Sequence, residues 1–445
     1  MLDAQQTYKA GWGHFEAREF EAAETCFRTV IASDPGFATG HYMLGVVLNF
    51  LGKWPAAADA FQSAITLAPK MAQAHAGLGS MLERLGRVGE AEVHLRRAVA
   101  LDPQLNLGRN ALAELLRGEG KLGEARALYE SVLARSPEDR NARFGRGVLS
   151  LLEGDLASGW NDYEYRVSRQ HATGPQFMPQ WRGENPTGRT LLLYAEQGLG
   201  DTIQFLRYAT LLAKAGARVI VAVPGTLVDL ASRVDGVQEV IATDATLPPF
   251  DFCAPLPSLP LYCRTTLDNI PWNGPYLSPP PGRRAVLPPN DAGHLTVALA
   301  WAGNPDNPYD YFRSLSVSQI APLLDTMGVR WLILQHGAGA EQIEPRSDIV
   351  KLGDQLDNFS DIAAIINSAD LTISVDTSFC HLAGAMGRPV WTLLAYVPDW
   401  RWLLQRSDSP WYPSMRLFRQ SSPRDWTGVI AAISQALAEH EKLRA

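Results

Sequence analysis

Several kinds of segment are missing from this sequence of 445 residues. It contains no run of eighteen apolar residues, which a membrane-spanning helix would need. Its first ten residues include Asp3 and Lys9 and lack the apolar core of a secretion signal. We therefore expect no transmembrane segment and a cytoplasmic location, and the sequence leaves peripheral attachment to a membrane assembly open.

Cysteine is scarce, and positive charge is not in excess. The four cysteines, Cys26, Cys253, Cys263 and Cys380, lie too far apart in sequence for a zinc site, which favours a reducing compartment. A formal net charge of −7 argues against nucleic acid or a membrane surface as the main partner.

Common catalytic motifs are also missing. The sequence contains no G-x-S-x-G, H-E-x-x-H or G-x-x-x-x-G-K-[ST], which argues against an esterase, a zincin and a P-loop enzyme. It contains no D-x-D, the obvious carboxylate pair for a divalent metal that holds a diphosphate. We therefore expect no metal and no cofactor.

What the N-terminal third contains is a repeat of 34 residues. Four columns recur in register: a proline (Pro35, Pro69, Pro103, Pro137), an alanine (Ala23, Ala57, Ala91, Ala125), a large apolar residue (Phe27, Phe61, Leu95, Tyr129) and a small residue (Gly11, Gly45, Gly79, Ala113). Gly52, Gly86 and Gly120 mark turns between two predicted helices in each unit. This pattern resembles the tetratricopeptide repeat, so we expect an all-α solenoid.

A fifth, degenerate unit follows, and the predicted array spans residues 1–171. It carries Gly147, Gly154, Gly159 and Tyr163 in the same columns, with His171 where a proline would stand. The repeat pattern places Tyr8, Trp12, Tyr42, Asn49, Asn110, Asn141 and Phe144 on the concave face. Asparagines there could clamp the backbone of a peptide partner, although the array could equally serve self-association into a homo-oligomer.

Beyond a Pro/Gly-rich linker over 172–189, strands and helices alternate, which predicts parallel sheets with helices on both faces. A second proline-rich stretch, 271–289, separates two halves, 190–285 and 286–445, with a ligand cleft expected between them. Strands are predicted at 190–195, 217–223, 237–241, 250–254, 295–301, 330–335, 371–375 and 390–394. Long helices are predicted at 201–215 and 426–443.

The most legible stretch runs from Leu371 to Trp391 and reads as strand, turn, helix, turn and strand. Asp376, Thr377 and Ser378 supply helix N-cap chemistry directly after the strand. A helix that begins at the carboxyl end of a parallel strand directs free N–H groups at the crevice above the sheet. The turn is therefore a candidate for holding the phosphates of a sugar nucleotide, the alternative being an ordinary crossover helix.

In the first half, the segment E-Q-G-L-G-D contains Gln197, Gly198, Gly200 and Asp201, which we predict to lie at the substrate. A dinucleotide fingerprint would need a third glycine where Ile203 stands, so NAD binding is not expected. Asp201 could be a general base for an acceptor hydroxyl, or it could cap the helix N-terminus. The two interpretations compete, because a capping carboxylate is stabilised as an anion and is a weaker base.

Four further candidates lie in the second half. Asn304 follows a strand in W-A-G-N-P, and Arg313 stands in a polar segment where its guanidinium could bind a phosphate. Gln335 ends a strand and could meet a base or ribose. His381 lies one turn inside the helix after Asp376, where imidazole could reach a phosphate oxygen, although a lone helical histidine is usually structural.

Together, A-E-Q-G-L-G-D-T-I-Q-F-L-R-Y, W-A-G-N-P, R-S, L-Q and S-V-D-T-S-F-C-H-L-A-G-A-M-G-R-P-V-W resemble the bacterial tetratricopeptide-repeat glycosyltransferases. The α/β part is similar to heptosyltransferases, and the overall plan is similar to O-linked N-acetylglucosamine transferases. The resemblance implies a GT-B fold, a nucleotide-sugar donor held mainly by the second half, no metal, and inversion at the anomeric carbon. It also implies donor roles for Asp376, Thr377, Ser378 and His381, and a base role for Asp201.

The sequence departs from this pattern at Tyr311 and His336, where related sequences tend to carry basic residues. We predict an inverting, metal-independent glycosyltransferase that transfers a sugar to a protein acceptor presented by the repeats. One alternative is a lipid or polysaccharide acceptor, with repeats used for localisation. Another is an inactive scaffold or a sensor of sugar nucleotides.

Overall fold

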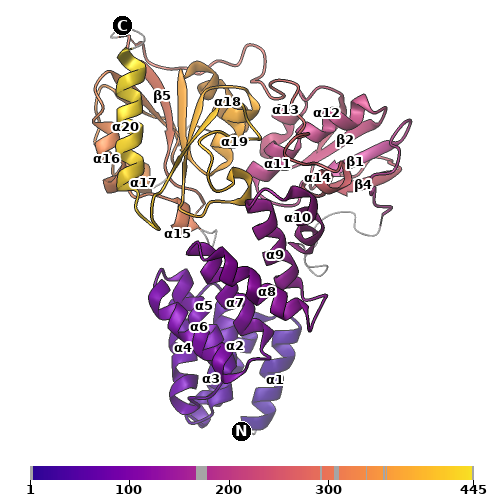
Figure 1. Ribbon diagram of the computed structural model, residues 1–445, viewed down its shortest axis with the longest axis vertical. Coiled ribbons are helices and arrows are strands. Elements are labelled where there is room, and N and C mark those ends of the chain that lie inside the picture. The colour runs from indigo at the N-terminus through magenta and orange to yellow at the C-terminus, as the bar shows by residue number, and fades with distance from the viewer. Residues whose placement is uncertain are drawn as a thin grey trace. The chain divides into compact units, whose positions relative to one another are not determined.

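The computed structural model describes residues 4–166, 178–290, 293–304, 310–336, 338–353, 356 and 358–442. The chain divides into two compact units, 1–149 and 150–445 (Figure 1). His171, Pro305 and the start of the predicted linker, 172–177, lie outside the described residues. The predicted boundary between array and linker at residue 171 therefore stays a prediction.

The first unit contains a helix pair for each of the four full repeats predicted. Its helices are α1 (Ala4–Glu16), α2 (Phe20–Ser33), α3 (Ala38–Phe50), α4 (Trp54–Leu67), α5 (Ala72–Arg84), α6 (Val88–Leu101), α7 (Asn106–Gly118) and α8 (Leu122–Leu133). The first helix of the degenerate unit, α9 (Arg140–Leu152), crosses into the second unit, which contains α10 (Leu156–Tyr163). The two helices of each pair pack against one another.

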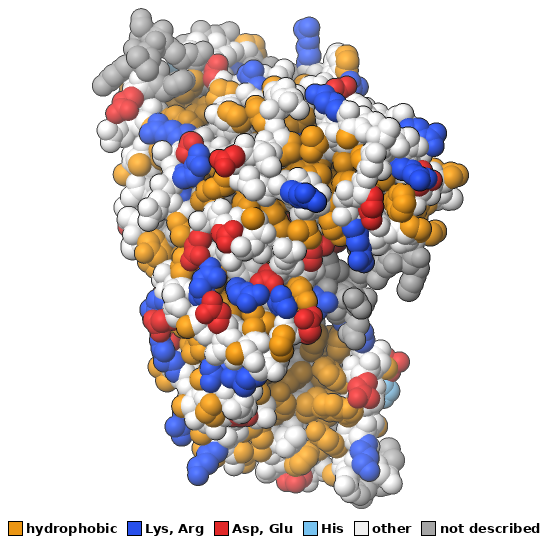
Figure 2. Space-filling view, turned by 45° about the vertical axis from the view of Figure 1, so that its right-hand side comes forward, with side chains coloured by type: hydrophobic (Ala, Val, Ile, Leu, Met, Phe, Trp, Pro, Cys, Tyr) orange, Lys and Arg blue, Asp and Glu red, His pale blue; other side chains and the backbone are white. Residues whose placement is uncertain are grey.

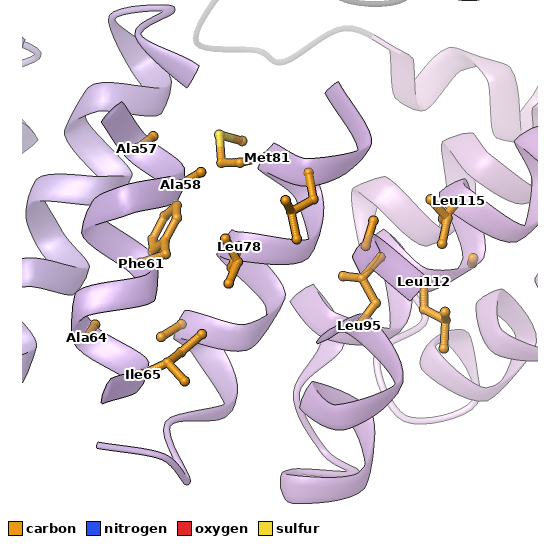
Figure 3. Close-up of a cluster of buried hydrophobic side chains, with 14 of the residues drawn as sticks. Ala57, Ala58, Phe61, Ala64, Ile65, Leu78, Met81, Leu95, Leu112 and Leu115 are labelled. Carbon is orange, nitrogen blue, oxygen red and sulfur yellow. The ribbon is translucent and has the colours of Figure 1, made fainter. Parts of the chain in front are cut away.

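The repeated columns form the core of this unit. The four column alanines are fully buried, and Phe27, Phe61, Leu95 and Tyr129 fill the space between helices. Figure 3 shows Phe61 projecting from α4 toward Leu78 of α5. A Cβ added at Gly45 would lie 2.8 Å from the Phe61 ring, so the small residue permits the close helix crossing.

A fifth column, which the sequence analysis did not identify, lies six residues after each proline. The side chains of His41, His75, Arg109 and Arg143 contact the carbonyl oxygens of Pro35, Pro69, Pro103 and Pro137 at 3.1, 3.2, 2.8 and 2.7 Å. These carbonyls lie in the loops between repeats, outside any helical hydrogen-bond ladder. The basic side chains therefore satisfy polar groups that the helices leave unpaired.

A matched pair of substitutions tests how the turns are built. Gly52 has φ +70°, Gly89 lies inside α6, and a Cβ at either position would meet no atom within 4 Å. We expect Gly52→Ala to lower the free energy of unfolding by about 1 kcal/mol, because alanine is strained at positive φ. Gly89→Ala should raise it by about 0.5–1 kcal/mol, because alanine is the better helix former. Urea unfolding midpoints measure both, and shifts of the same sign would contradict the assignment.

The second unit contains two parallel sheets. The first has the order β3-β2-β1-β4, with β1 (Thr190–Tyr194), β2 (Arg218–Val223), β3 (Val237–Ala242) and β4 (Phe252–Pro255). Its helices are α11 (Leu199–Phe205), α12 (Arg207–Lys214), α13 (Val228–Ala231) and α14 (Leu259–Tyr262). Each predicted strand of this half is present within two residues of its predicted ends.

The predicted single helix over 201–215 is wrong, because two helices replace it. The hydroxyl of Tyr276 donates to the carbonyl oxygen of Ile203 at 3.1 Å, and Arg207 Nε donates to that of Gln204 at 2.8 Å. In a continuous helix these carbonyls would accept from backbone N–H groups four residues later. Side chains distant from the local pattern thus interrupt the helix.

The second sheet has the order β10-β9-β8-β5-β6-β7. Its strands are β5 (Leu295–Ala300), β6 (Val329–Ile333), β7 (Ile349–Lys351), β8 (Leu371–Val375), β9 (Val390–Leu394) and β10 (Met415–Arg419), all parallel. The edge strands β7 and β10 were not predicted. β7 is only three residues long, and β10 carries two arginines among its apolar residues, so neither gives a strong apolar run.

Helices surround this sheet: α15 (Asp310–Arg313), α16 (Val317–Leu324), α17 (Ala338–Glu341), α18 (Phe359–Ser368), α19 (Ser378–Ala385) and α20 (Thr427–Lys442). From β5 the chain proceeds outward through β6 and β7, and it then returns to build β8, β9 and β10 on the other side. The order reverses between β5 and β8. Ligands in open parallel sheets bind outside the carboxyl ends of the strands at such a switch point.

In the described part of the chain, no helix is both long enough and apolar enough to span a membrane. The four cysteines are free thiols, and those of Cys253 and Cys380 are buried. Acidic and basic side chains are interspersed over the face shown in Figure 2.

Candidate functional site

The loops at the switch point are tied together by polar side chains. The loop after β5 is held by Gln335, whose Oε1 accepts from the N–H of Ala302 at 3.0 Å. Gly303 in the same loop donates its N–H to Ser314 Oγ at 2.8 Å. Asn304 is exposed just beyond it. The structure therefore places Gln335 and Asn304 at one edge of the sheet, with the Gln335 oxygen used to position the loop.

Arg313 joins the loop after β5 to the turn after β8. Its Nη1 donates to the carbonyl oxygen of Asp376 at 2.8 Å, and its Nε donates to Asp310 Oδ1 at 2.9 Å. The side chain keeps 27% of its surface exposed. Arg313 thus presents part of a fixed guanidinium at the carboxyl edge of the sheet, next to the predicted phosphate turn.

The turn after β8 contains Asp376, Thr377 and Ser378, and α19 begins at Ser378. Thr377 is the N-cap residue, yet its hydroxyl contacts Ser374 Oγ at 3.0 Å and caps no helix N–H. The predicted N-cap chemistry is therefore wrong in its detail. The consequence is that no N-cap side chain occupies the N–H groups that begin α19, which suits them to an anionic ligand.

His381 is buried one turn into α19, with 4% of its surface exposed. Its Nδ1 lies 2.9 Å from the hydroxyl of Tyr412, and its ring packs against that of Trp402 at a centroid distance of 5.3 Å. Burial, together with the nearby guanidinium of Arg401, holds the pKa of His381 well below its usual range. The imidazole is therefore neutral at pH 7, and its Nε2 lies 3.8 Å from Asp376 Oδ1.

The glycine turn of the first half packs directly on this histidine. A Cβ added at Gly200 would lie 2.8 Å from Cδ2 of His381, and helices α11 and α19 are in contact. Gly200 therefore serves close packing between the two halves of the second unit. Gly198 begins α11 as its N-cap residue, and Gln197 Oε1 accepts from the hydroxyl of Tyr163 at 3.0 Å.

Asp201 has both capping and charged contacts. Its Oδ2 accepts from the N–H of Gly198 at 2.9 Å, and its Oδ1 forms an ion pair with Arg401 Nη2. Burial nevertheless raises the pKa of the Asp201 carboxyl, outweighing the opposing effect of Arg401. Asp201 is therefore the third residue of α11 and not its N-cap residue, although it does accept from the N–H of the N-cap residue Gly198. This contact does not make the carboxyl an unusually weak base.

The guanidinium of Arg401 forms ion pairs with two carboxylates. Arg401 lies in the 3₁₀ turn η5 (Trp400–Trp402), is buried, and pairs with Asp399 at 2.7 Å as well as with Asp201. Burial raises the pKa of the Asp376 carboxyl to about 6, and the neighbouring Asp399 carboxylate adds to this rise. The guanidinium groups of Arg313 and Arg401 oppose the rise.

This arrangement predicts that Asp376 weakens the fold above pH 6. The pKa of this carboxyl is about 6 in the folded protein and 3.8 in the unfolded chain, so the free energy of unfolding falls as the pH rises from 3.8 to 6. We expect Asp376→Asn to increase the free energy of unfolding by about 1–3 kcal/mol at pH 7.5, with the gain vanishing near pH 4. Thermal unfolding at both pH values measures this. An equal gain at both would contradict the assigned burial effect.

Comparison with known proteins identifies both parts of the chain. A tetratricopeptide repeat family model matches residues 8–71, 50–106 and 110–173. The glycosyltransferase family 9 (heptosyltransferase) model matches residues 337–423. The chain carries tetratricopeptide repeats and a glycosyltransferase family 9 domain. The matched range of the glycosyltransferase family 9 domain includes the Asp376–His381 turn and excludes Asp201.

Protein FlbA of Caulobacter vibrioides is a distant homologue, 27% identical over 332 residues, which are 67% of this chain and 55% of FlbA. The chain thus spans about half the length of that relative. Two solved structures are similar to the repeats. YrrB, described as a TPR protein with an unusual peptide-binding site, is 23% identical to this chain, with a TM-score of 0.30. The match covers 37% of this chain and 84% of the YrrB chain. PilF of Pseudomonas aeruginosa is 20% identical, with a TM-score of 0.33. That match covers 36% of this chain and 74% of the PilF chain.

The glycosyltransferase family 9 domain has one described group of potential metal ligands, Asp376, Cys380 and His381. The Cys380 thiol is fully buried and donates to the carbonyl oxygen of Thr377 at 3.0 Å, and burial raises its pKa, which disfavours the thiolate that a metal needs. The positive charges of Arg401 and Arg313 lie close enough to affect Asp376 and His381, and they would repel a bound cation. These residues therefore fit a cation poorly.

Sequence reasoning missed Arg401 and Arg207 of this unit. Arg207 is buried, and its guanidinium lies 4.8 Å from the ring centre of Tyr412 and 5.3 Å from that of Trp411. The available signal was an arginine inside each aromatic-rich segment, F-L-R-Y and D-W-R-W. Aromatic neighbours indicate packing, but they do not reveal which distant carboxylate or carbonyl the arginine will meet.

Proposed function

We propose that this protein is an inverting, metal-independent glycosyltransferase that transfers a sugar from a nucleotide-sugar donor to a protein acceptor bound by its repeats. One observation carries the proposal. The family 9 match covers the turn after β8, and that turn lies at the switch point of the second sheet, beside Arg313. The proposed location is the cytoplasm.

The donor diphosphate would be held by the N–H groups that begin α19 and by Arg313. Thr377 and Ser378 contribute backbone N–H groups, and their helix adds a favourable partial charge. Because Arg313 is anchored through Asp310 and the Asp376 carbonyl, it needs little reorganisation to stabilise the charge on the departing diphosphate. Gln335 and Asn304 would contact the nucleoside side of the donor.

The acceptor hydroxyl would be deprotonated by Asp201. Its carboxylate uses one oxygen toward Gly198 and one toward Arg401, but an ionised carboxylate has about four lone-pair positions. It retains 22% side-chain exposure, so an acceptor hydroxyl could reach it. The acceptor oxygen attacks the anomeric carbon, its proton passes to Asp201, and the carbon–oxygen bond to the diphosphate breaks with its electron pair. A single displacement of this kind inverts the anomeric centre.

A panel of UDP-, GDP-, ADP-, CMP- and dTDP-sugars tests the donor assignment. We expect one nucleotide class to raise the unfolding temperature and to be hydrolysed or transferred slowly, because a ligand that binds the native state stabilises it. Ser378→Pro removes one N–H at the first residue of α19, where proline fits the helix, and should weaken this binding. Binding of no nucleotide by the wild-type chain would contradict the proposal.

A second candidate function is a sensor that binds a sugar nucleotide without turnover. The observation that favours it is the pairing of the described arginines near the turn: Arg401 with Asp201 and Asp399, and Arg313 with Asp310. His336, where a basic residue was expected, is exposed. Binding without hydrolysis or transfer, under conditions in which candidate acceptor proteins are present, would favour the sensor.

A further inference from the structure

The last helix of the repeat pattern, α10, packs into the α/β part of the second unit. Tyr163, the final residue of α10, stands 34 residues after Tyr129 and occupies the same repeat column. The earlier members of that column fill the core of the first unit, whereas Tyr163 contacts residues of the α/β part. Its side chain is buried there, with 3% of its surface exposed.

Tyr163 contacts both halves of the α/β part. Its hydroxyl donates to Gln197 Oε1 at 3.0 Å, in the glycine turn of the first half. Its ring packs edge-on against Trp400 of the second half, at a centroid distance of 5.6 Å. Trp160 on the same helix repeats this arrangement: its Nε1 donates to the carbonyl oxygen of Thr265 at 2.9 Å, and its ring also meets Trp400 edge-on. Helix α10 is therefore fixed to both halves.

The 3₁₀ turn η1 (Glu164–Arg166), which follows α10, holds the residue before Gln197. Arg166 has a side chain only 2% exposed, and it pairs with both carboxylate oxygens of Glu196 at 2.9 and 3.1 Å. Its Nη2 also donates to Ser258 Oγ at 2.7 Å. Glu196 follows β1 and Ser258 follows β4, its neighbour in the sheet. The end of the repeat pattern therefore braces the carboxyl edge of the first sheet.

Both residues that this tyrosine contacts adjoin a group that holds the Asp201 carboxylate. Gln197 precedes Gly198, whose N–H donates to Asp201 Oδ2 at 2.9 Å. Trp400 precedes Arg401, whose guanidinium pairs with Asp201 Oδ1. One anchor of the carboxylate thus comes from each half, and the same tyrosine packs beside both.

We propose that Tyr163 is a positioning residue for Asp201, the proposed base of sugar transfer. Its hydroxyl and its ring hold the two turns that supply the Gly198 N–H and the Arg401 guanidinium, and these turns fix the orientation of the carboxylate. This inference rests on the proposed function, because it concerns the base of that reaction. It adds that the transfer step depends on a residue of the degenerate fifth repeat, whichever acceptor is used.

The ionisation of Asp201 gives the proposal a specific signature. The charged or titratable groups that act on Asp201 include Arg401, Asp399, Glu196 and Tyr163. Burial raises the pKa of the Asp201 carboxyl, and the Arg401 charge and the Gly198 N–H oppose that rise. If Tyr163 holds these two opposing groups in place, loss of its hydroxyl should raise the pKa of Asp201 further.

The first test compares wild type with Tyr163→Phe in the full chain without ligand. Phenylalanine keeps the ring against Trp400 and removes only the hydroxyl. NMR of protein with isotope-labelled aspartate follows the Asp201 carboxyl, which is assigned by its loss in Asp201→Asn. We expect a higher pKa of Asp201 in Tyr163→Phe than in wild type, and an unchanged pKa would overturn the proposal.

Turnover of the nucleotide sugar that wild type uses provides the second test. Tyr163→Phe should lower the turnover number about tenfold, the effect of one lost hydrogen bond, and should leave the apparent affinity for the nucleotide sugar unchanged. The acidic limb of its pH profile should move to higher pH. In the Asp201→Asn background the same substitution should have no further effect, because both changes act through one carboxylate.

Tyr129→Phe is the matched control, because it removes a buried hydroxyl of the same repeat column, which donates to Glu114 at 2.8 Å. It should change neither the pKa of Asp201 nor the pH profile. An equal shift in this control, or an equal loss of turnover from Tyr163→Phe with and without Asp201→Asn, would overturn the proposal.

The two measurements separate this inference from the proposed function. A raised pKa of Asp201 in Tyr163→Phe, with no nucleotide sugar turned over by wild type, would refute the glycosyltransferase proposal and leave the control of Asp201 by Tyr163 standing. Transfer by wild type that Tyr163→Phe leaves unchanged would do the reverse.

Discussion

Asp201→Asn is expected to lower the turnover number for sugar transfer by about 10²- to 10⁴-fold, the usual contribution of a general base. The substitution keeps the size of the side chain and leaves Arg401 paired with Asp399. The apparent affinity for the nucleotide sugar should remain unchanged, because the proposed donor contacts come from the second sheet. Steady-state kinetics with a matched donor and acceptor separate the two effects.

The pH profile provides an independent check on this role. Because burial raises the pKa of Asp201, wild-type turnover should be full above that pKa and fall as the pH drops through it. The remaining activity of Asp201→Asn should lack this acidic limb. Asp244→Asn, at an exposed aspartate of the same half, serves as the control and should behave as wild type. Full turnover in Asp201→Asn would remove Asp201 from the mechanism.

Arg207→Met should lower the free energy of unfolding of the second unit by about 3 kcal/mol, the size of effect seen when a buried charged group loses its contacts. Arg207 Nε donates to the Gln204 carbonyl at 2.8 Å, and its Nη1 donates to that of Trp411 at 2.9 Å. Its Nη2 donates to the hydroxyl of Tyr276 at 3.1 Å. No carboxylate in the described residues pairs with it, so these neutral acceptors and the aromatic rings hold the charge.

Arg207→Lys keeps the charge but cannot bridge three acceptors that lie in different directions, so an intermediate loss is expected. Arg233→Met, at an exposed arginine of the same half, should change stability by less than about 0.5 kcal/mol. Chemical denaturation monitored by tryptophan fluorescence measures all three variants, since Trp411 contacts Arg207 directly. If Arg207→Met unfolds at the same denaturant concentration as wild type, the guanidinium does not join these segments.

The predicted donor residues illustrate what local sequence can reveal. Asp376, Thr377 and Ser378 were found because a short apolar strand, a polar turn and small helical residues follow one another in sequence. The structure confirms the strand and the helix, and it places both beside the switch point. The functional roles of these residues stay predictions until ligand binding is measured.

The surroundings of His381 and Asp201 illustrate the opposite case. Nothing within a few residues of either indicates that Tyr412 would contact the imidazole, that Gly200 would pack against it, or that Arg401 would pair with Asp201. Each of these partners is far in sequence from the residue it contacts, and Arg401 is 200 residues from Asp201. Their protonation follows from burial, which a local pattern does not determine.

The sequence by itself determined the helical repeats, the alternating strands, and the strand, turn and helix from Leu371 to Ala385. Each depends on spacing along the chain: 34 residues for the columns, and immediate succession for a strand and its helix. Tertiary structure alone decided the helix break at Leu206 and the ion pairs that Arg401 forms with Asp201 and Asp399. The physical reason is that hydrogen bonds and desolvation depend on which distant groups come within a few ångströms, and only the folded chain fixes those distances.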